Sequence, residues 1–148
     1  RRCFMQRLAA ELDVALAVGR PLSVAIADLD HFKVVNDGLG HPIGDLALRQ
    51  GAALMRRACN QSALVARIGG EEFALILPGM TRTEAASFCE TLRSGVEAHE
   101  WRTIHPALAI TISIGVAQWD GTADLEELMH AADAQLYRAK RAGRNQVA

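Results

Sequence analysis

The sequence has few of the features that mark secreted, membrane-bound or nucleic-acid-binding proteins. Its three cysteines, Cys3, Cys59 and Cys89, are odd in number and widely spaced, which fits neither a disulfide framework nor a zinc site. We therefore expect free thiols and a cytoplasmic location. The formal net charge of −1 provides no overall positive field for nucleic acid or a membrane surface. The longest apolar runs are far shorter than the roughly 20 residues of a membrane-spanning helix, and no signal peptide is visible.

Motifs of several common enzyme classes are also missing. No Gly-x-x-x-x-Gly-Lys-Ser/Thr segment occurs, which excludes a P-loop enzyme. The glycines do not form a Gly-x-Gly-x-x-Gly dinucleotide motif, and no serine lies in a Gly-x-Ser-x-Gly turn. The histidines are scattered without ligand spacing, so we expect surface or structural positions for His31, His41, His99, His105 and His130.

What is present is the composition of one folded domain. Half of the 148 residues are hydrophobic, which is ample for a core. The length is close to that of a usual single domain, so we assign residues 1–148 to one domain. The chain opens at Arg1 and Arg2 within a helical pattern, and we expect it to be a fragment of a longer protein.

The apolar patterns predict an α+β fold. The predicted elements are a helix over 3–18, a strand over 22–29, a helix over 31–39, a loop over 40–45, a helix to about residue 59, a hairpin over 64–77, a helix over 84–99, an irregular segment over 100–108, a half-buried strand over 109–117, a helix over 125–142 and a possible short strand at 146–147. Thr81 with Glu84, and Asp124 with Glu127, have capping-box spacing. After the first helix, this order contains β-α-β-β-α-β, the ferredoxin-like or palm-type arrangement, with a mostly antiparallel central sheet flanked by helices.

The stretch from Arg67 to Phe73 has an unusual composition for a turn. Gly69 and Gly70 separate two apolar runs, which predicts a β-hairpin whose glycines supply a positive φ. Two acids, Glu71 and Glu72, follow directly. Taken alone, the stretch can equally be a solvated hairpin tip.

Two further acids follow the predicted first strand. Asp30 is best explained as the N-cap of the next helix. Asp28 has no such explanation, because it would lie at the end of a buried strand. In the predicted fold the first strand is central and adjacent to a hairpin strand, so Asp28 and Glu71 can meet at one end of the sheet.

Two converging carboxylates form a site for a hard divalent cation. Mg²⁺ is usually held by one or two carboxylates together with substrate phosphates, and two such ions can clamp the oxygens of a phosphoryl displacement. Lys33, Lys140 and Arg144 are candidates for binding phosphate. The helix dipole alone can also explain the charge of Lys140 in the last turn of its helix.

Five motifs together resemble the GGDEF domain of diguanylate cyclases, in its Gly-Gly-Glu-Glu-Phe form. They cover essentially the whole chain in the family's order and spacing: Asp28-Leu29-Asp30-His31-Phe32-Lys33, Asn36-Asp37, Gly40-His41-x-x-Gly44-Asp45, Arg67-x-Gly69-Gly70-Glu71-Glu72-Phe73 and Tyr137-Arg138-Ala139-Lys140-x-x-Gly143-Arg144-Asn145.

The resemblance implies a metal site. Asp28, Glu71 and the backbone carbonyl of Leu29 match the ligands of Mg²⁺ or Mn²⁺, with two ions per half-site. Glu72 matches a second acid that the activity requires, in a metal or proton-handling role. Gly69 and Gly70 would let the backbone approach the nucleotide closely. Asp28, Glu71 and Glu72 are thus the implied catalytic residues.

The resemblance also implies a GTP site. Asn36 and Asp45 match the pair that recognises guanine, and an Asp at position 45 can accept hydrogen bonds from the guanine N1–H and N2–H₂ groups. Phe32 and His41 belong to the same substrate-binding motifs, His41 in a structural role. The phosphate-binding positions are matched by Lys33, Lys140 and Arg144.

The implied reaction condenses two GTP into cyclic di-GMP with release of two pyrophosphates. Each domain holds one GTP, so catalysis requires an antiparallel homodimer in which placement and electrostatic stabilisation lower the barrier. The alternative is a catalytically silent GGDEF module that binds GTP and regulates a partner. We expect no contact of this domain with nucleic acid or a membrane.

The sequence departs from the family in two places. The window of the Arg-x-x-Asp inhibitory product site is Asn60-Gln61-Ser62-Ala63, so we predict no product inhibition through that site. The family's opening segment, Asp-x-Leu-Thr-Gly-Leu-x-Asn-Arg, is represented only by its last Arg. Since that segment usually links to an upstream sensory or receiver domain, we expect such a domain in the full-length protein, which can be membrane-tethered.

Overall fold

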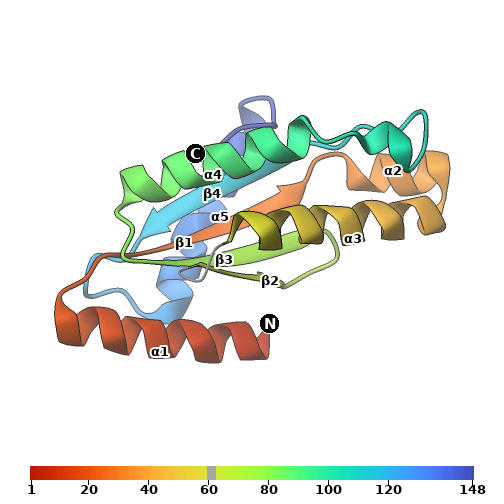
Figure 1. Cartoon of the computed structure of the whole chain (residues 1–148). Coiled ribbons are helices and arrows are strands. Elements are labelled where there is room, and N and C mark those ends of the chain that lie inside the picture. The colour runs from red at the N-terminus through yellow and green to blue at the C-terminus, as the bar shows by residue number, and fades with distance from the viewer. Residues whose placement is uncertain (60–62) are drawn as a thin grey trace.

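The computed structural model describes residues 1–59 and 63–148 and contains a four-stranded antiparallel sheet (Figure 1). The strands, in the spatial order β2-β3-β1-β4, are β1 Leu22–Leu29, β2 Leu64–Arg67, β3 Glu72–Pro78 and β4 Ile112–Gln118. The helices are α1 Arg2–Val18, α2 Phe32–Leu39, α3 His41–Ala58, α4 Arg82–Glu97 and α5 Leu125–Arg141, with a 3₁₀ turn at Trp101–Thr103. The predicted α+β fold and its order of elements are confirmed, including the central position of β1 beside β3.

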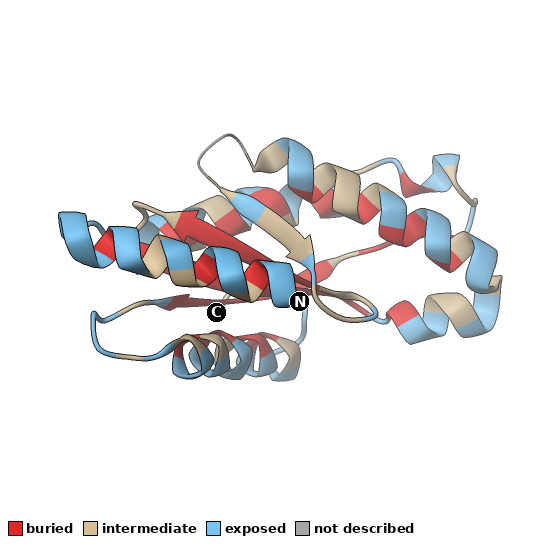
Figure 2. Cartoon of the chain, turned by 90° about the horizontal axis from the view of Figure 1, so that it is seen from below, coloured by how far each residue is buried: buried red, intermediate tan, exposed pale blue. Residues whose placement is uncertain are grey.

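Helices cover both faces of the sheet (Figure 1). On one face, α3 and α4 pack over Leu29, Phe73 and Leu75. On the other, α1 and α5 pack over Val24 and Ile76. All eight residues of β1 are consequently buried, and Figure 2 shows the buried residues on the strands and on the sides of the helices turned toward them. Two apolar cores therefore hold β1 from both sides and fix the position of its carboxyl end.

The prediction of a half-buried strand over 109–117 was wrong. The strand begins at Ile112, and its first six residues are buried on both faces. Helix α5 crosses the supposed polar face so closely that a Cβ on Gly115 would collide with the backbone of Ala132 and Leu136. The small residues of that face mark helix packing rather than exposure to water.

The predicted loop over residues 40–45 is mostly helical. Helix α3 begins at His41, with Pro42 in its first turn, where a missing N–H costs nothing. Gly40 alone separates α2 from α3, and it does so with a φ of 85°. The positive φ of one glycine therefore makes the sharp turn for which a six-residue loop was predicted.

The helix caps agree with their predictions better than the loop over residues 40–45 does. The capping boxes of Thr81 with Glu84 and Asp124 with Glu127 are both present, although α4 already begins at Arg82. The possible short strand at 146–147 is reduced to one isolated parallel bridge, between Val147 and Ile114. Among the described residues, no helix is long and apolar enough to span a bilayer.

Candidate functional site

The carboxyl end of β1 lies directly beside the hairpin. In the antiparallel register, Asp28 faces Glu72 of β3 on one side and Ser113 of β4 on the other. The backbone N–H of Leu29 donates to the carbonyl of Glu71 over 3.3 Å. Strand pairing therefore places the two acids of the hairpin next to Asp28, at one end of the sheet.

Asp28 is a buried carboxylate whose charge is incompletely balanced. Only 7% of the residue is exposed, and the ammonium of Lys140 lies 3.0 Å from its Oδ1. Burial raises the pKa of Asp28 above its ordinary value, and the charges of Glu71 and Glu72 raise it further, whereas the hydrogen bond and charge of Lys140 lower it. A buried carboxylate beside two other acids gains stability from any added positive charge.

The donors at this end of the sheet fit a magnesium ion that is shared with a substrate. Within residues 1–59 and 63–148, no three Asp, Glu, His or Cys side chains are arranged to hold a metal by themselves. Mg²⁺ does not need such a cage, because it takes one or two carboxylates and completes its shell with water and phosphate oxygens. The carboxylates of Asp28 and Glu71 and the carbonyl of Leu29 form a donor set of that kind.

The Gly-Gly turn differs from its prediction. Neither Gly69 nor Gly70 has a positive φ. The amides of Ile68 and Gly69 donate to the carbonyl of Glu72 over 2.9 and 3.3 Å. A Cβ on Gly69 would lie 2.5 Å from a carboxylate oxygen of Glu72. Gly69 therefore leaves room for the Glu72 carboxylate and does not serve the turn through a positive φ.

The side chain of Arg67, for which we predicted no role, clamps this turn. Its Nε lies 3.1 Å from the carbonyl oxygen of Gly69 and 3.0 Å from that of Gly70, and its Nη2 lies 2.7 Å from the latter. The signal was present in the sequence, since Arg67 is part of the hairpin motif. The turn is therefore held by hydrogen bonds from the Arg67 guanidinium to two carbonyls, and not by glycines with a positive φ as predicted.

The predicted guanine-binding residues lie on the α2–α3 side of the sheet end. Phe32 and Asn36, one helical turn apart, pack against Gly44, where a Cβ would collide with the Asn36 side chain and lie 3.3 Å from the Phe32 ring. The next residue, Asp45, lines a cavity of about 430 Å³. The other residues that line this cavity come from α3 and the hairpin: Leu48, Arg49, Ala52, Arg56, Val65, Ala66, Arg67 and Phe73.

The structure brings only one of the predicted cations to the acids. Lys140 pairs with Asp28. Arg144 lies in the loop after α5, in a left-handed conformation with a φ of 65°. Lys33 and His41 are exposed, on α2 and at the start of α3, and within the described parts of the chain neither pairs with an acid.

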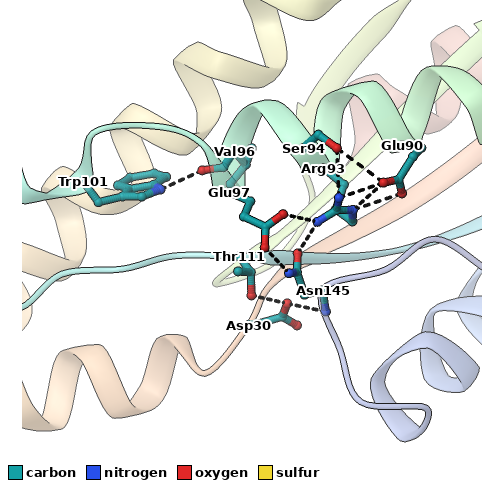
Figure 3. A network of polar contacts seen from close by, with 9 residues as sticks. All are labelled: Asp30, Glu90, Arg93, Ser94, Val96, Glu97, Trp101, Thr111 and Asn145. Atoms are coloured by element: carbon teal, nitrogen blue, oxygen red, sulfur yellow. Dashed lines mark hydrogen bonds and ion pairs between the residues drawn. The ribbon is translucent and has the colours of Figure 1, made fainter.

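The prediction that Asp30 caps α2 was wrong. The residue before α2 is His31, and its side chain makes no capping bond. Asp30 is 4% exposed and accepts three hydrogen bonds: from Thr111 Oγ1 over 2.7 Å, from Ser113 Oγ over 2.7 Å and from the backbone N–H of Asn145 over 3.0 Å. Figure 3 shows those from Thr111 and Asn145. The fold buries the Asp30 carboxylate, and a buried carboxylate needs hydrogen-bond donors. Residues far away in the sequence provide these donors, so Asp30 does not cap the neighbouring helix.

The predicted absence of an inhibitory product site concerns residues 60–63. Of these, Asn60, Gln61 and Ser62 lie outside the described residues, so the absence of the site stays a prediction.

Comparisons with known proteins agree with this geometry. The family described as "Diguanylate cyclase, GGDEF domain" matches residues 1–146. Diguanylate cyclase DgcP of Pseudomonas aeruginosa is 36% identical over 99% of this chain and 22% of its own length. Diguanylate cyclase DosC of Escherichia coli is 39% identical over 93% of this chain and 30% of its own length. The chain thus spans less than a third of these curated relatives.

The fold has a close counterpart among solved structures. The GGDEF domain of DgcB from Caulobacter crescentus, crystallised in complex with c-di-GMP, superposes with a TM-score of 0.92 at 35% identity. The match covers 99% of this chain and 88% of that one. Family match, sequence relatives and fold agree, and the chain belongs to the GGDEF-domain family of diguanylate cyclases.

Proposed function

We propose that this domain condenses two GTP molecules into cyclic di-GMP and two pyrophosphates. The observation that carries the proposal is the buried, incompletely balanced carboxylate of Asp28, which strand pairing places beside Glu71 and Glu72. Relatives that are named diguanylate cyclases, and a DgcB domain in complex with c-di-GMP, support the same reaction.

In this proposal Asp28, Glu71 and the carbonyl of Leu29 hold Mg²⁺ or Mn²⁺, with two ions per half-site. The bound ion supplies Lewis-acid polarisation and neutralises charge on the phosphates. Glu72 lies opposite Asp28 in the sheet register, so its carboxylate serves the same end of the sheet in a metal or proton-handling role.

The nucleotide extends across the end of the sheet. Asp45, with Asn36 beside it, accepts the donor edge of guanine at the cavity between α3 and the hairpin. Lys140 and Arg144 bind phosphates on the α5 side, and Lys33 adds a cation from α2. When GTP and the metal bind, the ammonium of Lys140 exchanges Asp28 for a phosphate oxygen.

The bond changes require two facing domains. The 3′-hydroxyl of one GTP gives up its proton, to a carboxylate of the site or to water, as its oxygen forms a bond to the α-phosphorus of the other; the bond to the bridging α–β oxygen breaks, and pyrophosphate leaves. A second, symmetric step closes the ring. Each domain supplies one such site, so the active form is an antiparallel homodimer, and a regulatory domain elsewhere in a longer protein controls the pairing.

Turnover of GTP tests the proposal. The protein is incubated with GTP and Mg²⁺ at several protein concentrations, and the products are separated by chromatography. We expect cyclic di-GMP to form at a rate that rises more than linearly with protein concentration, and Glu71→Ala to give none while retaining the wild-type melting temperature.

The alternative, a silent regulatory module, predicts a different result. In that case a fusion to a constitutive dimerisation domain binds GTP but forms no product. Wild-type turnover in Glu71→Ala would contradict the metal assignment.

A further inference from the structure

The loop that follows α5 has an unusual backbone. Gly143, Arg144 and Asn145 have φ values of 120°, 65° and 46°, so three successive residues are left-handed and two of them are not glycine. Side chains rarely adopt this region, and such a backbone persists only where its surroundings hold it. The contacts that hold this loop therefore determine where Arg144 lies.

The main chain of the loop is held by the end of the sheet and by the last turns of α5. The N–H of Asn145 donates to the buried carboxylate of Asp30, and the N–H of Arg144 donates to the carbonyl of Ala139 over 3.0 Å. Asp30 is itself fixed by the hydroxyls of Thr111 and Ser113. The backbone of the loop is thus tied to the ends of β1 and β4.

The side chain of Asn145 is held from α4 (Figure 3). Arg93 Nη1 donates to its Oδ1 over 2.7 Å, and its Nδ2 donates to Glu97 Oε1 over 2.7 Å. Arg93 also pairs with Glu97 and Glu90, and only 12% of its side chain is exposed. Both ends of one amide are therefore engaged by a preformed ion-pair network.

This contact joins the two layers of helices. Helices α4 and α5 lie on opposite faces of the sheet (Figure 1), and the contact passes the edge formed by β4. The segment that it anchors carries both cations of the α5 side: Arg144 precedes Asn145 directly, and Lys140, 3.0 Å from Asp28, lies in the last turn of α5.

We infer that Asn145 and Arg93 are positioning residues, which hold the loop after α5 and so fix where Arg144 lies relative to the last turn of α5, whose Lys140 pairs with Asp28. Neither touches the reacting atoms. The inference rests on the proposed function in one respect, which is that Arg144 and Lys140 bind phosphate. The holding of the loop by α4 is independent of that function.

The contacts of the Asn145 side chain with Arg93 and Glu97 are called the clamp below. Two variants remove the clamp and keep the backbone hydrogen bond to Asp30. Asn145→Gly keeps the N–H that donates to Asp30 and favours the left-handed backbone, and Arg93→Ala removes the clamp from the other side. Glu90→Gln is the matched control, because Glu90 contacts Arg93 and Ser94 but not Asn145. All variants are measured in the complete domain well below their melting temperatures.

Two measurements separate positioning from general stability. Affinity for a non-hydrolysable GTP analogue with Mg²⁺ is measured by calorimetry, and amide hydrogen exchange is followed for residues 143–146. We expect both clamp variants to weaken binding about tenfold, because misplaced groups lose binding energy. Exchange in the loop should also rise about tenfold, while Glu90→Gln stays within about twofold of wild type in both.

The outcomes distinguish this inference from the proposed function. Unchanged exchange at residues 143–146 in both clamp variants would overturn the inference. Increased exchange with unchanged affinity would show that α4 holds the loop, but it would overturn the positioning role of Asn145 and Arg93 in nucleotide binding. If the wild-type domain does not bind the analogue, the proposed function fails, and the exchange measurement alone decides whether α4 holds the loop.

Discussion

Two carboxylates at the end of β1 have opposite surroundings. Asp28 and Asp30 are two residues apart and are both buried, at 7% and 4% exposure. Asp30 accepts hydrogen bonds from two hydroxyls and one backbone amide. Asp28 has a single ion pair with Lys140, and its pKa is raised by burial and by two neighbouring acids. The same residue type at similar depth thus serves the fold at one position, and in our proposal it binds a cation at the other.

The largest expected effect separates activity from stability at Asp28. Asp28→Asn should lower cyclic di-GMP formation at least about 100-fold, because a metal ligand contributes several kcal/mol to charge stabilisation. The free energy of unfolding should change by less than about 1 kcal/mol, since an amide of the same shape removes a charge that burial opposes. Chromatography and urea unfolding measure the two quantities, and a large stability loss with retained turnover would reverse the roles of the two acids.

At Asp30 we expect stability to be the affected quantity. Asp30→Ala leaves the buried hydroxyl of Ser113, the half-buried hydroxyl of Thr111 and the Asn145 amide without their acceptor, and it should lower the free energy of unfolding by about 2–3 kcal/mol. Turnover per folded molecule should fall less than in Asp28→Asn. Urea unfolding gives the first value, and an unfolding free energy equal to that of the wild type would show that Asp30 does not support the fold.

The smallest effects should come from the two hydroxyl donors. Ser113→Ala and Thr111→Val each remove one of the bonds to Asp30, and each should cost about 0.5–1.5 kcal/mol of unfolding free energy. We expect turnover within about threefold of wild type in both, since each removes about one hydrogen bond outside the reaction. Ser113 is also the cross-strand neighbour of Asp28, so a selective loss of turnover in Ser113→Ala would assign its hydroxyl to Asp28 instead.

The sequence predicts the parts of this arrangement that depend on local patterns. Apolar periodicity gives the order of elements, and the acids of both capping boxes lie three residues from their caps. The role of Asp30 escapes this kind of reasoning because its donors are 81, 83 and 115 positions away. A helix-cap rule considers only the next few residues, whereas burial of a carboxylate selects whichever donors the fold brings near.

The hairpin and β4 show a second limit, which concerns space. Two glycines favour a positive φ, but at Gly69 the missing side chain makes room for the Glu72 carboxylate, and Arg67 holds the turn. Alternation in β4 suggests an exposed face, but Gly115 makes room for α5. Space decides both cases: within the turn itself at Gly69, and between β4 and the later helix α5 at Gly115.

The central claim is that Asp28, and not Asp30, is available for a metal ion. Paramagnetic resonance of Mn²⁺, titrated into the domain with a non-hydrolysable GTP analogue, tests it most directly when the isosteric variants Asp28→Asn and Asp30→Asn are compared. We predict that Asp28→Asn abolishes measurable binding of Mn²⁺ to the protein–nucleotide complex, while Asp30→Asn stays within about tenfold of the wild-type affinity. Wild-type Mn²⁺ affinity in Asp28→Asn, or a loss confined to Asp30→Asn, would contradict the claim.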